Sequence, residues 1–590
     1  MDGFISRFSA DGKELIYSTF IGGEWGEYFN GLALDSEDNS YVTGESCSTE
    51  YPLVNPFQDG AGTSCHVIVS KLSSDGSQLL FSTFYRSWSE FMGIHANDIY
   101  VDATRKVTIV GSTYSGDIPL KNPLQEIKGF ENTDGFIAKF SASGNQLLFA
   151  SYIGGESGND EITSITMDKE EKHYFIAGET RSTDFPVKNA AQPTINKANQ
   201  EFGNSIATDA FVMKLKADGS DIIYSSYFGG NLNEHVAAVD VDDAGNAYIA
   251  GMTGSWVEFP YLHSIKTEMD AFGDMYVTKL NPEGQIIYAT TLGGDDGGNS
   301  DLFPAPEELW DMKADAAGNV YLAGSALWAN FPLVNPPAGM QVSKAADAVV
   351  VKLGPVDNNK PTVPAIVWSG RHGGEGFDFA RNIAISGNDV WILGRTESAN
   401  IPVTEGAFQP ALGGSLDLFL LHINQTDPTS DSLQFTQAEQ EVGSSATFVE
   451  VQISRSGKHS GVLTLPWSTV DDTAKAGTDY QQQSGVLQWA ANDSEPKYIQ
   501  INLLAKTAGT QFKLKLEQPT SSLYQVALGG NAELTLKFKA AEQPATAPVT
   551  TPPAQGSTPP AAAKPESSSG GAIGWFSLLL LPLRLRRRKA

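Results

Sequence analysis

Residues 134–155 read DGFIAKFSASGNQLLFASYIGG, two apolar stretches joined by the turn Ser143-Gly144. Aromatic and β-branched residues fill both stretches and a glycine pair ends the second, which predicts two antiparallel strands connected by a tight hairpin. The first stretch recurs from Asp2, Asp209, Asp274, Asp347 and Asp417, and residues 66–72 repeat it without the aspartate. These seven copies are separated by about 69 residues on average, so one structural unit is repeated along the chain.

Each unit continues into two further predicted strands. One strand ends in an aspartate and the next follows a turn, as in residues 242–251, DDAGNAYIAG, and residues 315–324, DAAGNVYLAG. A loop with an aromatic residue or isoleucine before proline, such as Phe185-Pro186, closes the unit. Four short strands per unit, punctuated by glycine, are typical of a propeller blade, whereas a sandwich does not explain one period repeated six times.

These motifs resemble the SBBP family of β-propeller repeats, and the resemblance covers residues 1–427. It implies an all-β fold with a propeller of six to seven four-stranded blades. The chain holds seven copies of the Asp-Gly-Phe strand but six of the strand that ends in the unit's aspartate. We therefore expect the chain to start partway through a blade and the complete product to have seven blades. Six blades closed by the N-terminal strands are the alternative.

The period stops after residue 427, and residues 428–540 predict a β-sandwich of seven or so short strands. The strings AKAGTDY (474–480) and SGVLQW (484–489) resemble a Calx-beta domain. That family binds calcium through an early glutamate, here Glu441, and an acidic run before a late strand. The run has become LLAKTAG (503–509), without a carboxylate, although Ca²⁺ prefers six to eight oxygen ligands. Glu441, Asp471, Asp472 and Asp479 remain weak candidates for metal ligands, and a solvated acidic edge is the simpler interpretation.

The C-terminus predicts a spacer followed by a processing signal. Residues 541–569 are rich in Pro, Ala, Thr and Ser, which is typical of an extended linker. Residues 570–590 contain Gly570-Gly571, a short apolar stretch and a basic end. The apolar stretch, 572–583, is shorter than the roughly 20 residues that span a bilayer, so a weak tail anchor is the alternative to a signal.

Residues 570–590 resemble the GlyGly-CTERM signal of Gram-negative bacteria. The resemblance implies an exported protein whose partners are the export machinery and a rhombosortase-type intramembrane protease acting near Gly570 and Gly571. It also implies membrane contact only through this tail before processing, and a final location at the cell surface or outside the cell. Residues 1–8 have no signal-peptide features, so we expect the N-terminus of the exported protein to be truncated here.

The net charge and the cysteine content limit the classes of function that the chain can have. The 590 residues include 40 Lys and Arg against 69 Asp and Glu, a net charge of −29, which argues against a nucleic-acid binder that relies on general basicity. The two cysteines, Cys47 and Cys65, are too few for a disulfide framework. They flank the Tyr51-Pro52 loop, and in an exported chain a disulfide between them is predicted, with two inert thiols as the alternative.

No catalytic motif, phosphate-binding loop or metal-ligand cluster is recognisable in the sequence. One repeated position lies eight residues before the aspartate position that ends a strand of each unit, as Glu234 lies before Asp242. In five of six units this position carries a carboxylate: Glu27, Asp160, Glu234, Glu307 and Asp378. Nearby aromatic residues are Trp25, Tyr28, Trp88, Trp310 and Phe377. One hypothesis is an acidic ring with an aromatic rim at the channel mouth that binds Ca²⁺, a cationic group or a sugar. The favoured interpretation is that each carboxylate accepts backbone N–H bonds at a turn between blades.

Two classes of function follow. The first is a non-catalytic, surface-attached or secreted binding scaffold that meets a glycan, a protein or a matrix. The second is an extracellular polysaccharide hydrolase or lyase with its site in the propeller channel, since a fold does not decide a function. We rank the enzyme lower because the sequence offers no pair of catalytic carboxylates and no nucleophile with its base.

Overall fold

The computed structural model describes residues 2–539 except 61–63, 89–92, 131, 197–206, 256, 268–272, 295–306, 327–330, 338–339, 341–345, 425–431, 445, 457–461, 491–492, 494, 522–525 and 529–530. Every helix or strand assigned within these residues is a β-strand, so the chain is all-β as predicted. The predicted linker, 541–569, and the predicted signal, 570–590, lie outside the described residues. None of the described residues form a helix long and apolar enough to cross a membrane.

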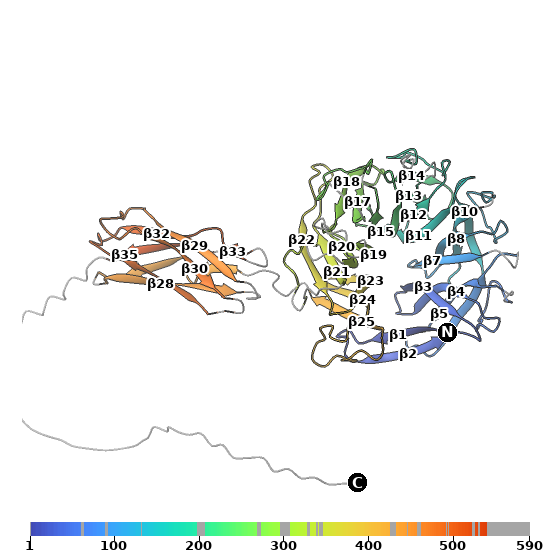
Figure 1. Ribbon diagram of the computed structural model, residues 1–590, viewed down its shortest axis with the longest axis horizontal. Coiled ribbons are helices and arrows are strands. Elements are labelled where there is room, and N and C mark those ends of the chain that lie inside the picture. The colour runs from blue at the N-terminus through green and yellow to red at the C-terminus, as the bar shows by residue number, and fades with distance from the viewer. Residues whose placement is uncertain are drawn as a thin grey trace, which may run out of the picture. The chain divides into compact units, whose positions relative to one another are not determined.

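Five four-stranded antiparallel sheets follow one another in the repeat region, and in each sheet the strands pair in chain order (Figure 1). The strands of these sheets are β3 (Glu27–Leu34), β4 (Ser40–Ser46), β5 (His66–Leu72) and β6 (Leu79–Tyr85); β7 (Ile94–Val101), β8 (Val107–Thr113), β9 (Asp134–Phe140) and β10 (Leu147–Ile153); β11 (Asp160–Met167), β12 (His173–Thr180), β13 (Asp209–Lys216) and β14 (Ile222–Phe228); β15 (Glu234–Val241), β16 (Ala247–Thr253), β17 (Asp274–Leu280) and β18 (Ile286–Leu292); β19 (Glu308–Ala314), β20 (Val320–Ala326), β21 (Asp347–Leu353) and β22 (Ile366–His372).

Two smaller sheets flank these five along the chain. The first contains two strands, and the last contains three. Their members are β1 (Gly3–Phe8) and β2 (Leu15–Ile21) in the first, and β23 (Asp378–Ser386), β24 (Asp389–Thr396) and β25 (Asp417–Asn424) in the last. By repeat position β1 and β2 correspond to the third and fourth strands of a full sheet, and β25 corresponds to a third strand.

The hairpin predicted in residues 134–155 is confirmed. β9 and β10 pair antiparallel, with Ala138 opposite Ala150. Gly144 in the turn has a φ of 72°, a conformation that glycine adopts without steric cost. The repeated Asp-x-x-Gly-Asn-x-Tyr pattern also has a local cause. Asp242 accepts hydrogen bonds from the backbone N–H of Asn246 (3.0 Å), the Asn246 side chain (2.7 Å) and the Tyr248 hydroxyl (2.9 Å), which holds the turn between β15 and β16.

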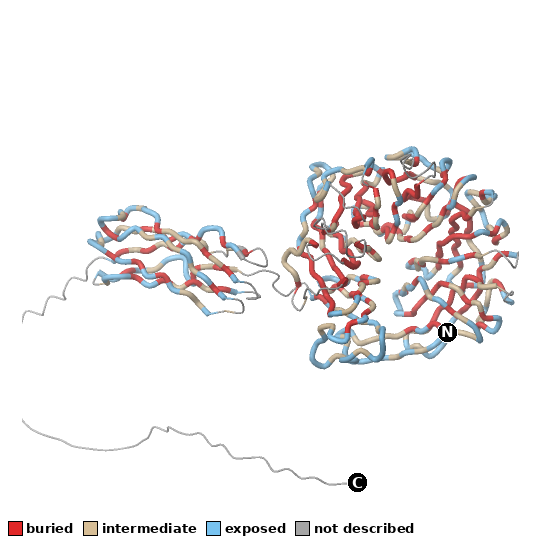
Figure 2. Tube along the Cα trace, in the orientation of Figure 1, coloured by how far each residue is buried: buried red, intermediate tan, exposed pale blue. Residues whose placement is uncertain are grey.

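Neighbouring sheets pack face to face. The first strand of a sheet contacts the first and second strands of the sheet before it, as β15 contacts β11 and β12. Buried apolar side chains fill these contacts, for example Ile162 and Phe211 in one cluster, and Val236 and Phe228 in the next. The buried positions follow the strands of every full sheet (Figure 2). Each repeat therefore covers its apolar face with the next repeat, which is why several copies are needed.

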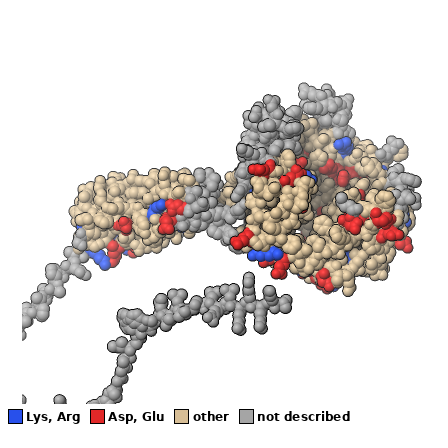
Figure 3. Space-filling view, turned by 60° about the horizontal axis from the view of Figure 1, so that its bottom comes forward, with Lys and Arg blue, Asp and Glu red and all other residues tan. Residues whose placement is uncertain are grey.

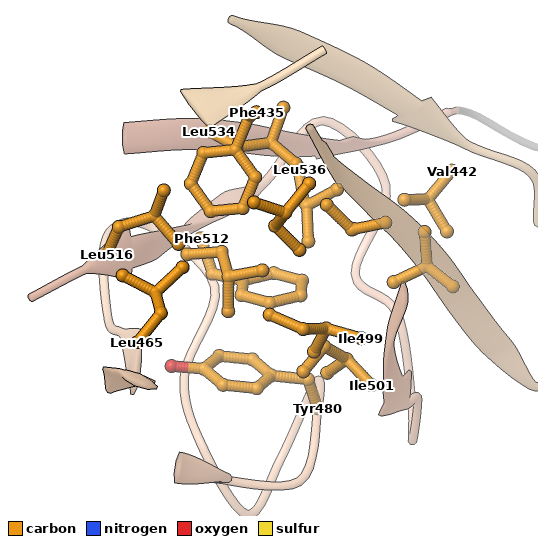
Figure 4. Close-up of a cluster of buried hydrophobic side chains, with 14 of the residues drawn as sticks. Phe435, Val442, Leu465, Tyr480, Ile499, Ile501, Phe512, Leu516, Leu534 and Leu536 are labelled. Atoms are coloured by element: carbon orange, nitrogen blue, oxygen red, sulfur yellow. The ribbon is translucent and has the colours of Figure 1, made fainter. Parts of the chain in front are cut away.

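The last ten strands form two sheets with a core of their own. One sheet has the order β31-β28-β26-β34, and the other has the order β27-β35-β32-β29-β30 with β33 beside β29. The strands are β26 (Ser432–Phe435), β27 (Glu439–Val442), β28 (Phe448–Ser456), β29 (Leu463–Val470), β30 (Ser484–Trp489), β31 (Lys497–Asn502), β32 (Gln511–Leu516), β33 (Thr520–Ser521), β34 (Ala527–Leu528) and β35 (Glu533–Phe538). Phe435, Phe512 and Ile501 meet between them, and Tyr480 stacks on Phe512 at 4.0 Å (Figure 4). This is the predicted β-sandwich.

Candidate functional site

The five repeated carboxylates lie at the start of the first strand of a sheet or next to it, and all five are buried. Four of them accept a hydrogen bond from the second glycine of the preceding Gly-Gly pair: Asp160 from Gly155 N–H (2.8 Å), Glu234 from Gly230 (3.0 Å), Glu307 from Gly294 (2.9 Å) and Asp378 from Gly374 (2.8 Å). Serine hydroxyls also donate to these groups, as Ser182 does to Asp160 (2.7 Å). Acceptance of N–H bonds at a turn is the interpretation that the sequence favoured.

A second carboxylate faces these groups, and sequence reasoning did not assign it a partner. The aspartate that begins the third strand of the preceding sheet lies beside the first-strand carboxylate. Gly154 shows the geometry, because an added Cβ there would lie 2.7 Å from Asp134 Cγ and 2.8 Å from Asp160 Oδ2. Gly229 occupies the same place between Asp209 and Glu234. The first residue of the Gly-Gly pair is therefore glycine because two carboxyl groups occupy the space of a side chain.

Burial raises the pKa of these carboxyl groups. The pKa of Asp160 is raised to about 6 and that of Glu234 to about 7, since removal from water penalises the charged form. Burial and then the Glu234 charge raise the pKa of Asp209 to about 8. Burial also raises the pKa of Glu307 to about 8, with a contribution from Asp274.

We call the place where two such carboxyl groups of neighbouring sheets meet a junction. Two junctions contain a positively charged side chain. Lys266 Nζ lies 3.1 Å from Asp274, and Arg371 Nε lies 2.9 Å from Asp347. In two other junctions a neutral amide occupies the corresponding loop position: Gln125 donates to Asp134 (2.9 Å), and Gln192 donates to Asp209 (3.0 Å). Among the described residues no group of three or more His, Cys, Asp or Glu is arranged to hold a metal ion.

The predicted aromatic rim divides into two environments. Trp25, Tyr28, Trp88 and Phe377 are exposed by 65 %, 55 %, 64 % and 49 %, and they lie in or next to the loops before β3, β7 and β23. Trp310 differs, because it lies within β19 and is partly buried, with the Arg381 guanidinium 3.6 Å from its ring. The first four residues are therefore the exposed members of the predicted rim, while Trp310 belongs to a cation–π contact between β19 and β23.

Charged side chains on the first strands form a further group that sequence reasoning missed. Asp98 on β7 accepts the N–H of Ile165 on β11 (2.9 Å), and Asp240 on β15 accepts the N–H of Ala314 on β19 (2.8 Å). Both carboxylates, together with Asp311, raise the pKa of Lys313 on β19. These contacts join first strands of neighbouring sheets. In β7 and β19 an aspartate directly follows the β-bulge, and this is the signal that could have identified Asp98 and Asp311.

The structure joins Cys47 and Cys65 in a disulfide that closes the loop between β4 and β5. Replacing both cysteines with serine is expected to lower the free energy of unfolding of the repeat region by about 3 kcal/mol, because the 18-residue separation limits the unfolded chain. Urea unfolding of the oxidised protein and of the variant measures this. The chain has no other cysteine, so the reduced unmodified protein is a matched control that should unfold at the same urea concentration as the variant. Equal unfolding midpoints for the oxidised protein and the variant would contradict the expectation.

The acidic residues of the sandwich are engaged with the chain. Asp479 accepts hydrogen bonds from the N–H groups of Lys475 and Thr507 (2.9 Å each), and Asp471 accepts the Tyr480 hydroxyl (2.7 Å). Asp472 accepts the Gln511 amide (2.8 Å), and Glu441 pairs with Lys539 (2.6 Å). A hollow beside Asp471 and Asp472 is also lined by Lys513, Lys515 and Glu533, so two positive charges offset its three carboxylates. The donor set does not fit a calcium site.

Calcium is therefore expected to leave the unfolding transition of the sandwich unchanged. A site with a Kd of about 10 µM would add about 2.7 kcal/mol of stability at about 1 mM Ca²⁺. Differential scanning calorimetry of the full chain with Ca²⁺ and with EDTA measures this difference. A rise of the sandwich midpoint with Ca²⁺ that Asp479→Asn abolishes would overturn the expectation.

Comparison with known proteins identifies one part of the chain. No curated protein matches it. Among solved structures, the apo-form Calx CBD1 domain is 22 % identical over 18 % of this chain and 98 % of its own length, with a TM-score of 0.17. The acylaminoacyl peptidase of Pyrococcus horikoshii is 9 % identical, covering 73 % of this chain and 58 % of its own, with a TM-score of 0.26. The Calx-beta domain model matches residues 427–537, and this segment of the chain is a Calx-beta domain.

Proposed function

We propose that this chain is an exported bacterial binding protein, in which a propeller of SBBP-type repeats presents a ligand-binding face and a Calx-beta domain follows it. The observation that carries the proposal is the exposed aromatic rim of Trp25, Tyr28, Trp88 and Phe377. Large aromatic side chains that remain in water beside the first strands favour a binding surface, because burying them against a ligand is favourable. The ligand class is a glycan, whose apolar ring faces stack on aromatic side chains.

Other features support export and a neutral or cationic ligand. The Cys47–Cys65 disulfide suits an oxidising compartment outside the cytoplasm. Acidic side chains are more widespread than basic ones on the face in Figure 3, which disfavours a polyanionic ligand. The proposal includes the GlyGly-CTERM-like tail, cut by a rhombosortase-type protease after export, with residues 541–569 as the spacer.

The proposal also includes a seven-bladed ring in which β1 and β2 are the outer half of one blade. Leu32 on β3 is 63 % exposed, whereas its counterpart Ile99 on β7 is 5 % exposed and packs on the preceding sheet. Leu418 and Leu420 on β25 are also exposed, although their counterparts on β13 and β9 are buried. Two inner strands of the kind that β15 and β16 form would cover these apolar side chains.

A polysaccharide hydrolase or lyase is ranked below binding on geometric grounds. The repeated carboxyl groups with raised pKa are enclosed between sheets, so they do not reach a substrate in the channel. A panel of bacterial and plant polysaccharides, assayed both for retention of the protein and for release of reducing ends, separates the two functions. We expect retention without cleavage. Released sugar would overturn the binding proposal in favour of the enzyme.

A further inference from the structure

The buried carboxyl groups of the repeat region occur as pairs. One member of each pair is the aspartate at which the third strand of a sheet begins. The other member is the carboxylate at the start of the first strand of the next sheet. The pairs are Asp2 with Glu27, Asp134 with Asp160, Asp209 with Glu234, Asp274 with Glu307, and Asp347 with Asp378. In the one remaining junction the two positions are His66 and Ile94, so both carboxylates are absent together. If each carboxylate only accepted its own N–H bonds, one could be absent while the other remained. Their joint absence at this junction indicates that the two carboxylates of a pair depend on each other.

Two of these pairs are enclosed and short of donors. Asp134, Asp160, Asp209 and Glu234 have no exposed surface. Asp134 Oδ1 and Asp209 Oδ1 find no hydrogen-bond donor in the part of the chain that the structure describes, and the same holds for Glu27 Oε2 and Asp378 Oδ1 in two other pairs. Two neighbouring carboxylates that are both ionised without water would repel each other at high cost, and each bare oxygen adds a desolvation penalty.

The junctions differ in how the negative charge is balanced. Lys266 contacts Asp274 of the pair Asp274/Glu307, where burial still raises the pKa of Glu307 to about 8, and Arg371 contacts Asp347 of the pair Asp347/Asp378. Gln125 and Gln192 are neutral, so the pairs Asp134/Asp160 and Asp209/Glu234 have an amide where Lys266 supplies a charge. The smallest cation that restores the balance, and that needs no cavity and no third ligand, is a proton.

We propose that the pairs Asp134/Asp160 and Asp209/Glu234 each hold one proton between their two carboxyl groups, and that release of this proton to solvent loosens the junction between the two sheets. In the protonated pair one carboxyl group donates its O–H to a carboxylate oxygen of the other. When the proton leaves, two carboxylates face each other, and the contacts of β9 with β11 and of β13 with β15 weaken. The repeat region thus contains two pH-sensitive latches.

Among the described residues around each pair no cation forms an ion pair with a carboxylate, although the charge of Lys128 lowers the pKa of Asp134 against the larger effect of burial. Around Asp209 and Glu234, the donors are Gln192, the N–H groups of Asn196 and Gly230, Thr253 and Ser255. The charge of His235 also acts on Glu234, and the His235 ring pairs with Glu179 (3.0 Å). Around Asp134 and Asp160, the donors are Gln125, the N–H groups of Gly129 and Gly155, Thr180 and Ser182. Lys128 near Asp134 donates to the carbonyls of Gly129 and Asn132, while Asp184 adds negative charge.

The pH window follows from the direction of the shifts. The folded pairs bind a proton more tightly than free carboxyl groups do, since the pKa of Asp160 is about 6, that of Glu234 about 7 and that of Asp209 about 8. Their contribution to stability is complete below the ordinary carboxyl pKa and is lost as the pH rises through the folded values. The repeat region should therefore lose stability as the pH rises from about 4 to about 8, and the loss should level off above the folded values.

Urea unfolding of the full chain at a series of pH values tests the proposal. For each proton held by a folded pair, the unfolding constant of the repeat region should rise about 10-fold per pH unit between the ordinary carboxyl pKa and the folded pKa, and it should level off above the folded pKa. Asp209→Asn replaces the protonated member of one pair, so it should lower this slope by about one proton and make the variant more stable than the unmodified protein at high pH. Asp347→Asn is the matched control at the Arg371 junction, where we expect lower stability at every pH with an unchanged slope.

Two further readouts keep the proposal falsifiable. If Asp209→Asn does not fold, infrared spectroscopy of the unmodified folded protein tests the proposal instead. The carbonyl band of protonated carboxyl groups should persist at pH 6 and disappear by pH 9. The absence of this band at pH 6 would overturn the proposal. A rise in stability at high pH on adding Ca²⁺, absent in Glu234→Gln, would also overturn it, because a metal ion would then occupy the junction.

Discussion

Replacing Arg371 with leucine is expected to lower the free energy of unfolding of the repeat region by about 3–5 kcal/mol. Arg371 and Asp347 are both fully enclosed, with Nε and Oδ2 2.9 Å apart, and a second guanidinium nitrogen donates to the carbonyl of Ala326 (2.8 Å). Removing the guanidinium leaves Asp347 beside Asp378 without the positive charge of Arg371. Most of the loss comes from this uncompensated charge and not from the attraction in the intact pair.

The matched control is Arg395→Leu, the same substitution in a partly exposed ion pair with Glu397 at 3.2 Å. Water solvates that pair, so we expect a loss of less than about 1 kcal/mol. Urea unfolding followed by far-ultraviolet circular dichroism measures both variants. The double variant Arg371→Leu/Asp347→Asn should recover part of the lost stability. Equal losses for the two arginine variants would contradict this account of the junction.

The local structure of the repeats could be predicted from the sequence because its causes lie within a few residues. The hairpin of residues 134–155 depends on Gly144 and on the apolar residues on either side of it, and all of these are visible in one stretch. The Asp242 turn is similar, since its donors Asn246 and Tyr248 follow at four and six residues. In such patterns residues close in sequence determine the turn, so the strands lie where the repeated motif predicts them.

The carboxyl pairs could not be predicted in the same way because their members belong to different sheets. Asp209 and Glu234 are separated by the whole of β14, and the sequence does not show that both side chains point into one junction. The compensating cations come from unrelated positions, Lys266 from a loop and Arg371 from β22. Trp310 illustrates the same limit, because its place within β19 depends on where the strand begins.

The aromatic rim is the central claim, and a rim variant tests it most directly. In the triple variant Trp25→Ala/Trp88→Ala/Phe377→Ala, three exposed rings are truncated without disturbing a core. If each ring contributes about 1 kcal/mol or more to binding, affinity for the retained ligand should fall at least about 100-fold. The control variant, Tyr498→Ala/Phe448→Ala/Leu504→Ala, truncates three similarly exposed side chains of the Calx-beta domain.

Retention of the three proteins on a panel of immobilised polysaccharides is the decisive measurement, with urea unfolding to verify that all three are folded. The account predicts that the unmodified protein and the control variant are retained on the same glycans and that the rim variant is lost from them. Equal retention of the rim variant, or retention of none of the folded proteins on any glycan, would contradict the claim that this rim is a glycan-binding face.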